Sequence, residues 1–151
     1  MASRDYLIRQ IEEMGLFLSI LLKRILKLKE ENQQDQMQSV VVDAFRDETG
    51  LDIDQIVLLE NADFLEVVKL HFTSEDQLTK LADILRVLGM QIEQSFTLSR
   101  LNYLQKSLVL YSWLQENSTN YSYERRANML EIQKLLFSIK SLNESWQNTV
   151  L

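Results

Sequence analysis

Apolar residues near the start of the chain recur at alternating intervals of four and three residues, which is the spacing of a heptad repeat on a helix. This pattern predicts one long helix over about residues 4–31. A second apolar stripe runs beside the first, so the apolar face is wider than one neighbouring helix would cover. The heptad stripe consists of Leu7, Ile11, Met14, Leu18, Leu21, Ile25 and Leu28. The second stripe consists of Ile8, Phe17, Ile20, Leu22 and Leu26.

The heptad stripe supports two interpretations. A heptad over three repeats favours pairing between chains, most simply as a symmetric homodimer whose interface is formed by the seven stripe residues. The same stripe would also serve as intramolecular core if the helix lies in a groove of its own domain. The sequence leaves both interpretations open, and with them the oligomeric state.

Helical periodicity continues after a fully polar stretch at residues 30–36. Start and stop signals divide the remainder of the chain. Gly50 suits the position that follows a helix, Ser74 and Gln77 form a capping box, and Ser122 can cap the last helix. The predicted helices cover about residues 37–49, 52–59, 61–72, 74–89, 97–115 and 122–146.

Two local signals in these segments carry specific expectations. Asp52 is expected to cap a short helix, with Gln55 three residues further on as its capping partner. Gly89 is expected either to end its helix or to let a neighbouring helix approach closely. A turn is expected near residues 91–95.

The scarcity of helix breakers sets the fold class. The chain has no proline and only three glycines, whereas sandwiches and barrels usually need more turn residues than this. No strand partner is visible for the β-branched run at residues 40–42. We therefore predict an all-α fold, an antiparallel bundle of about six to seven helices. Residues 1–151 form a single domain, in which the long N-terminal helix accompanies a helical-pair core over about residues 37–147.

The segment 78–136 resembles tetratricopeptide-type helical pairs. The residues that carry the resemblance are Leu85, Leu88, Gly89 and Ile92 in a first helix, and Leu104, Ser107 and Leu108 in a second. The resemblance implies helix pairs in the C-terminal half, with the glycine where the two helices cross closely. The usual closing proline is absent and no 34-residue period recurs, so the likeness is to a fragment of that fold. The opening residues 5–12 also resemble the start of small bacterial helical proteins of unknown function, which implies bacterial origin.

Charge bears on the choice of partner. The chain carries 16 basic and 22 acidic residues, a net charge of −6, and broad binding to phosphate backbones needs a cationic surface. We therefore expect no nucleic-acid partner. A local cluster of Lys23, Arg24, Lys27 and Lys29, or the pair Arg125–Arg126, keeps a helix-based nucleic-acid-binding regulator as the alternative.

Recognisable catalytic chemistry is absent from the sequence. There is no cysteine, which excludes disulfides and thiolate chemistry, and His71 is the only histidine, which is too few for a zinc site. We expect no catalytic residue, no cofactor and no metal, and we predict that the protein is not an enzyme. An enzyme without a recognisable motif is a distant third hypothesis, after an interaction module and a nucleic-acid-binding regulator. The apolar run at residues 14–22 is shorter than the roughly 20 residues of a spanning helix, so we expect a cytoplasmic protein without a membrane partner.

Aromatic residues gather near the last inter-helix loop and can form a partner surface or ordinary core. They are Tyr103, Tyr111, Trp113, Tyr121 and Tyr123. With no catalytic motif, the helical pairs and the wide apolar face of the first helix favour a protein–protein interaction or scaffold module. We predict that this module self-associates through its N-terminal helix; the sequence names no partner.

Overall fold

The computed structural model describes residues 2–91 and 98–150, and the side chains of residues 3–90 and 100–141. Within these ranges the chain forms seven α-helices, one short 3-10 helix (η1, Gln34–Gln36) and no strand, which confirms the all-α prediction. The helices are α1 (Ala2–Glu30), α2 (Met37–Thr49), α3 (Ile53–Ile56), α4 (Asn61–His71), α5 (Glu75–Gln91), α6 (Leu98–Asn117) and α7 (Tyr123–Val150). The turn expected near residues 91–95 falls almost wholly outside the described residues.

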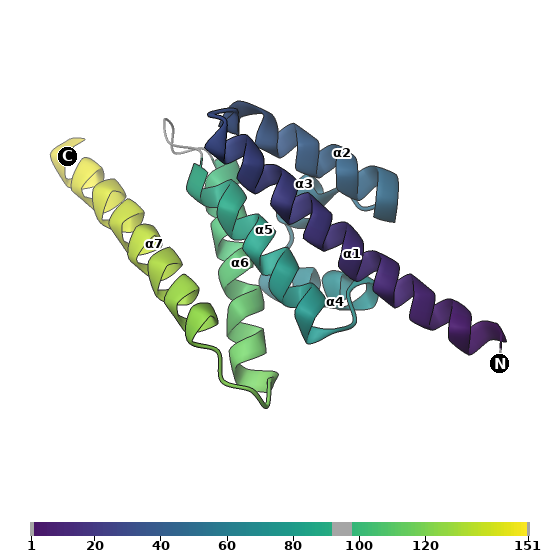
Figure 1. The fold of residues 1–151 in the computed structure, drawn as a ribbon. Helices are drawn as coiled ribbons and strands as arrows, with labels where there is room; N and C mark the ends of the chain where they lie inside the picture. Colours follow the sequence, from purple (N-terminus) through teal and green to yellow (C-terminus); the bar gives the residue numbers. More distant parts are fainter. Residues whose placement is uncertain (1, 92–97, 151) are drawn as a thin grey trace.

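The helices are arranged around the pair α5 and α6, which make the most extensive contact of the fold (Figure 1). On one side of this pair, α1 crosses α5 and runs beside α2. On the other side, α4 and α7 contact α6. Because α6 has neighbours on several sides, its buried residues are not confined to one stripe. The N-terminal turns of α1 extend past the end of α2, as Figure 1 shows.

A single cluster of buried apolar residues joins these helices. Phe45 of α2 lies at its centre on the α1 side, with its ring centroid 5.4 Å from that of Phe17 and 6.1 Å from that of Phe72. Both ring pairs meet edge to face, the arrangement that aromatic quadrupoles favour. Fully buried members of the cluster include Leu18 and Ile25 of α1, Val41 of α2, Phe64 of α4, Leu81 and Leu85 of α5, and Leu104 and Leu114 of α6.

Small side chains let α5 and α6 approach each other closely. A Cβ atom at Gly89 would lie 2.5 Å from Cγ of Leu104, so the absence of a side chain at residue 89 is required by the neighbouring helix. About two turns earlier on α5, the buried hydroxyl of Ser107 donates a hydrogen bond to the carbonyl oxygen of Ala82 at 2.7 Å. Gly89 therefore does not end its helix, and the second of the two expectations is confirmed.

Two helix starts follow the predicted caps. The Ser74 hydroxyl accepts a hydrogen bond from the Gln77 N–H at 3.1 Å, and the Ser122 hydroxyl accepts one from the Arg125 N–H at 3.1 Å. The Gln77 side chain has a further role, because its amide nitrogen donates to the carbonyl oxygen of Ile11 at 2.9 Å. The cap of α5 thus also holds α1 in place.

The segment between α2 and α4 departs from the prediction in one respect. Gly50 has φ of 74° and follows α2, as expected of a glycine after a helix. Asp52, however, makes no capping hydrogen bond within the described residues, because its carboxylate pairs with the Nε atom of Arg46 at 2.9 Å. The expected capping box with Gln55 is therefore wrong, and α3 is shorter than the predicted helix over residues 52–59.

Candidate functional site

The predicted heptad stripe divides into a buried part and an exposed part. Leu18, Leu21 and Ile25 are buried in the chain's own core, which corrects the predicted inter-chain interface at these three positions. The reason is that α2 and α5 cover this length of α1. Met14 and Leu28 are partly buried against the same core. Leu7 and Ile11, in contrast, are 56% and 47% exposed, and for them the interface remains a prediction.

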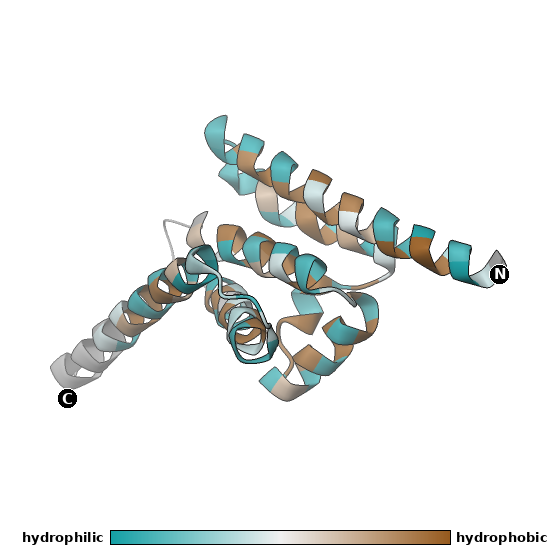
Figure 2. Cartoon of the chain, turned by 60° about the horizontal axis from the view of Figure 1, so that its bottom comes forward, coloured by the Kyte–Doolittle hydropathy of each residue, from teal (hydrophilic) through white to brown (hydrophobic). Residues whose placement is uncertain are grey.

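The exposed part of the stripe belongs to a surface that we call the overhang, defined by Leu7, Ile8 and Ile11. These residues precede the part of α1 that α2 covers, and hydrophobic positions continue along this part of the helix in Figure 2. A groove of about 480 Å³ lies beside the overhang and is also lined by Leu70 of α4, which is 75% exposed. Gln77 also lines this groove.

A second exposed apolar surface lies on another side of α1. We call it the ridge and define it by Leu16 and Ile20. The two side chains are 61% and 57% exposed. They border a groove of about 380 Å³ between α1 and α2, whose apolar lining also includes Phe17, Leu21 and Ala44. The small side chain of Ala44 leaves room above α2 for an inserted apolar group.

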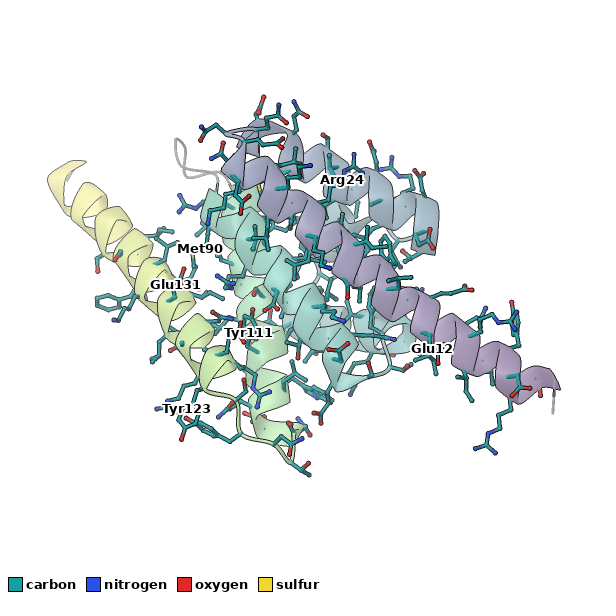
Figure 3. The ribbon with its side chains drawn as sticks, viewed as in Figure 1. Glu12, Arg24, Met90, Tyr111, Tyr123 and Glu131 are labelled. Carbon is teal, nitrogen blue, oxygen red and sulfur yellow. The ribbon has the colours of Figure 1, made fainter. Side chains whose placement is uncertain are left out.

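Charged residues of opposite sign lie along the groove beside the ridge. Glu13 of α1 and Glu48 of α2 both line it, and so does Arg24, which lies three turns further along α1. Figure 3 shows Arg24 toward the C-terminal end of α1, with Glu12 well toward the other end. One end of the groove is therefore acidic and the other basic. Ile20 belongs to the predicted second stripe. The groove itself could not be predicted from the spacing of residues on α1, because the packing of α2 brings Ala44 and Glu48 to it.

The predicted aromatic surface does not exist as one surface. Tyr103 and Tyr111 are core residues with exposed fractions of 1% and 0%, because α6 is enclosed by α4, α5 and α7. Burial raises the pKa of Tyr103, whose hydroxyl accepts a hydrogen bond from the Gln38 side chain at 3.2 Å. Only Tyr121 and Tyr123 are well exposed; their rings meet edge to face with centroids 4.7 Å apart. Figure 3 places Tyr123 at the start of α7, away from Tyr111.

Trp113 lies in a third groove, of about 440 Å³, between α4, α6 and α7. The ammonium of Lys69 lies 4.6 Å from the centroid of its indole ring, a cation–π contact. Nearby, Lys106 is almost fully buried, and its Nζ atom donates to the Asn61 side chain at 3.0 Å. Burial lowers the pKa of Lys106. Because Lys69 and Lys106 each have a partner within the fold, their positions are explained by packing and do not require a ligand.

A polar cluster that the sequence did not reveal links α5, α6 and α7. The Tyr111 hydroxyl donates a hydrogen bond to Asp83 and accepts one from the Asn128 side chain at 3.4 Å. Burial raises the pKa of Asp83; the hydrogen bond from Tyr111 and the charge of Arg86 oppose that shift, whereas Glu124 and Asp76 add to it. Burial, together with the Asp83 charge, also raises the pKa of Tyr111. These bonds tie α7 to the central helix pair.

Replacing Asp83 by asparagine tests this cluster. Because the folded-state pKa of Asp83 lies above its ordinary 3.8, the native state holds its proton more tightly than the unfolded chain. The stability that the group contributes is complete below pH 3.8 and is lost as the pH rises through the folded-state pKa. The Asp83→Asn variant has no such group to ionise. We therefore expect the difference in free energy of unfolding, variant minus wild type, to increase between mildly acidic and neutral pH. Urea unfolding at a series of pH values measures it; a pH-independent difference would contradict the assignment.

The remaining candidates for chemistry lie apart. The Nδ1 atom of His71 lies 3.1 Å from the carbonyl oxygen of Val67 one turn earlier. Among the described residues, no three His, Cys, Asp or Glu side chains are grouped as a metal site would need. Within the same residues, none of the helices has the length and apolar character to cross a membrane.

The basic cluster of α1 is exposed. Exposure is expected both of a face that only contacts solvent and of a face that binds a partner, so it does not distinguish the two. Its members are Lys23, Arg24, Lys27 and Lys29. They are followed directly by Glu30 and Glu31, and Arg125, the other basic candidate, is buried and bonded to Gln115 and Asn120. Nucleic-acid binding thus has no further observation in its favour.

Comparison with known proteins gives no relative whose surfaces could be compared with these. No protein family, no curated protein and no solved structure matches the chain. The tetratricopeptide-like pairing and the bacterial origin therefore stay predictions.

Proposed function

We propose that this protein is an interaction module that associates with a second copy of itself through exposed apolar residues of α1. One observation carries the proposal: a single helix presents the overhang and the ridge, five large aliphatic side chains that are each about half exposed. Single exposed apolar residues are normal on any protein surface. Two apolar surfaces on one helix, each beside a groove, are typical of a surface that a partner covers.

The division of α1 supports the same function. Its buried residues anchor the helix in the fold, so the exposed residues are held on a rigid element instead of a mobile tail. A preformed apolar surface loses little conformational entropy when a partner covers it. In contrast, the chain offers no described group of side chains arranged for catalysis, so we do not propose an enzymatic activity.

Light scattering on a size-exclusion column tests the proposal with the full chain. We expect the mass of the wild type to rise from monomer to dimer with protein concentration. A double variant with one charge on each surface, Ile11→Glu with Ile20→Glu, is expected to remain monomeric because an interface core does not accept unpaired charges. Circular dichroism should show that it keeps its helix content, since both residues are exposed.

The matched control introduces two glutamates elsewhere, Leu58→Glu with Phe137→Glu. Both residues are at least as exposed as those of the test variant, at 59% and 72%, and both lie outside α1. This control is expected to dimerise like the wild type. A wild type that stays monomeric at every concentration would disprove self-association.

A further inference from the structure

We infer that two copies pair through their ridges, with the two α1 helices antiparallel and each ridge seated in the other copy's groove between α1 and α2. This inference rests on the proposed function and adds which surface and which orientation are used. The primary contact is then the ridge and not the overhang, although the overhang contains the exposed residues of the heptad stripe. The order of residues along one face of α1 favours this pairing.

Four residues share the face that borders the groove. Glu13, Leu16, Ile20 and Arg24 follow one another at intervals of three, four and four residues, so they form one line along the helix. The apolar pair is central and the charges of opposite sign are at the two ends. Such a line is complementary to itself only when one copy is reversed.

The positions along the helix axis match when the copies are related by a two-fold axis. An axis passing between residues 18 and 19 places Leu16 of one copy nearly level with Ile20 of the other. It also places Glu13 level with Arg24 of the other copy, each about 8 Å from the axis at 1.5 Å per residue. A symmetric pair forms this contact twice. A parallel pair would instead set Glu13 against Glu13 and Arg24 against Arg24.

The second helix of the groove strengthens the match. Glu48 of α2 lines the acidic end together with Glu13, so an incoming Arg24 would meet two carboxylates. Ala44 and Phe17 form the apolar part between the ends. Arg9 and Lys27 continue the same line beyond its two ends, and the reversed pairing brings their like charges near each other. Their exposed side chains are long enough to turn into solvent.

Charge reversal tests the pairing of residues 13 and 24 with the full chain. Glu13→Arg and Arg24→Glu, each alone, place like charges together twice per dimer, and we expect each to raise the dimer Kd about tenfold or more. Mixing the two variants creates a heterodimer with one native pair and one reversed pair. We therefore expect the equimolar mixture to regain a dimer that neither variant forms alone at the same total concentration.

Cysteine cross-linking tests the orientation, since the chain has no cysteine of its own. Residues 13 and 24 are about 16 Å apart on one helix, too far for a bond within a chain. Under mild oxidation, a chain carrying both Glu13→Cys and Arg24→Cys is expected to form a covalent dimer. Either cysteine alone is expected to leave the chain monomeric on a non-reducing gel, whereas parallel helices would cross-link both single variants.

The outcomes separate the inference from the proposed function. If the wild type dimerises but neither charge reversal weakens the dimer, the antiparallel ridge contact is wrong and self-association stands. The same holds if the double-cysteine chain does not cross-link at a concentration at which its reduced form is a dimer. In that case a Leu7→Glu variant, which changes only the overhang, would identify the alternative surface. If the wild type is monomeric throughout, both the function and the inference fail.

Discussion

Shortening Leu18 to alanine is expected to lower the free energy of unfolding by about 3 kcal/mol, the usual cost of removing a buried leucine side chain. Leu18 is fully buried where α1 meets the rest of the core. The change removes apolar contacts and leaves a cavity that the helices around it only partly fill. Urea unfolding followed by circular dichroism measures the loss as a lower midpoint with an unchanged slope.

The control for this prediction is the same change at an exposed leucine. Leu58→Ala, at a residue that is 59% exposed, is expected to alter stability by no more than about 0.5 kcal/mol. Both chains should be compared at a low protein concentration, because dimer formation adds to apparent stability. A Leu18→Ala chain as stable as the Leu58→Ala chain would mean that α1 does not belong to the core.

Because α1 contributes both core residues and exposed residues, point changes and truncations of this helix test different things. Removing residues 1–32 would take Leu18, Leu21 and Ile25 out of the core together with the exposed surfaces. Such a truncated chain is expected to unfold whether or not the protein self-associates. Point changes on the exposed face avoid this ambiguity, because they leave the buried face intact.

Replacing Gly89 by alanine is expected to lower the free energy of unfolding by about 1 to 2 kcal/mol, against the ordinary direction of a glycine-to-alanine change in a helix. The new Cβ would lie 2.5 Å from Cγ of Leu104 and 3.2 Å from its backbone nitrogen. Leu104 is fully buried, so neither its side chain nor its backbone can move away without displacing other core residues. This overlap outweighs the gain of roughly 1 kcal/mol in helix propensity.

Gly15 supplies the matched control, because it also lies inside a helix. A Cβ atom at this residue would meet no described atom within 4 Å. Gly15→Ala is therefore expected to raise the free energy of unfolding by about 0.5 to 1 kcal/mol. Thermal or urea unfolding of the two variants should give shifts of opposite sign. A stabilising Gly89→Ala change would contradict the close crossing of α5 and α6.

Local features of the sequence predicted most of the secondary structure. Ser74 and Ser122 could be recognised as caps, and Gly50 as a residue that follows a helix, because such signals act over one turn of the chain. The absence of proline predicted long helices for the same reason. The prediction failed at Asp52, where a competing partner, Arg46, lies close enough in sequence and space to take the carboxylate. The β-branched run at residues 40–42 lies within α2, since its apolar face is buried at Val41.

The functional site was predicted less well, because its members come from different helices. Periodicity identified α1 and the apolar residues on it, including Leu7, Ile11 and Ile20. It could not identify the groove beside the ridge, to which α2 contributes Ala44 and Glu48. It also could not separate Tyr103 and Tyr111 from the exposed tyrosines, because that depends on how many helices surround α6.

The sequence by itself determined the all-α class, most of the helix boundaries and the apolar character of α1, since each follows from the spacing of residues within one helix. Only the tertiary structure decided which apolar residues are core. A heptad stripe shows which residues share a face, but not how far the neighbouring helices extend along it. Here α2 and α5 cover Leu18, Leu21 and Ile25 and leave Leu7 and Ile11 exposed, because burial depends on contacts between residues that are distant in sequence.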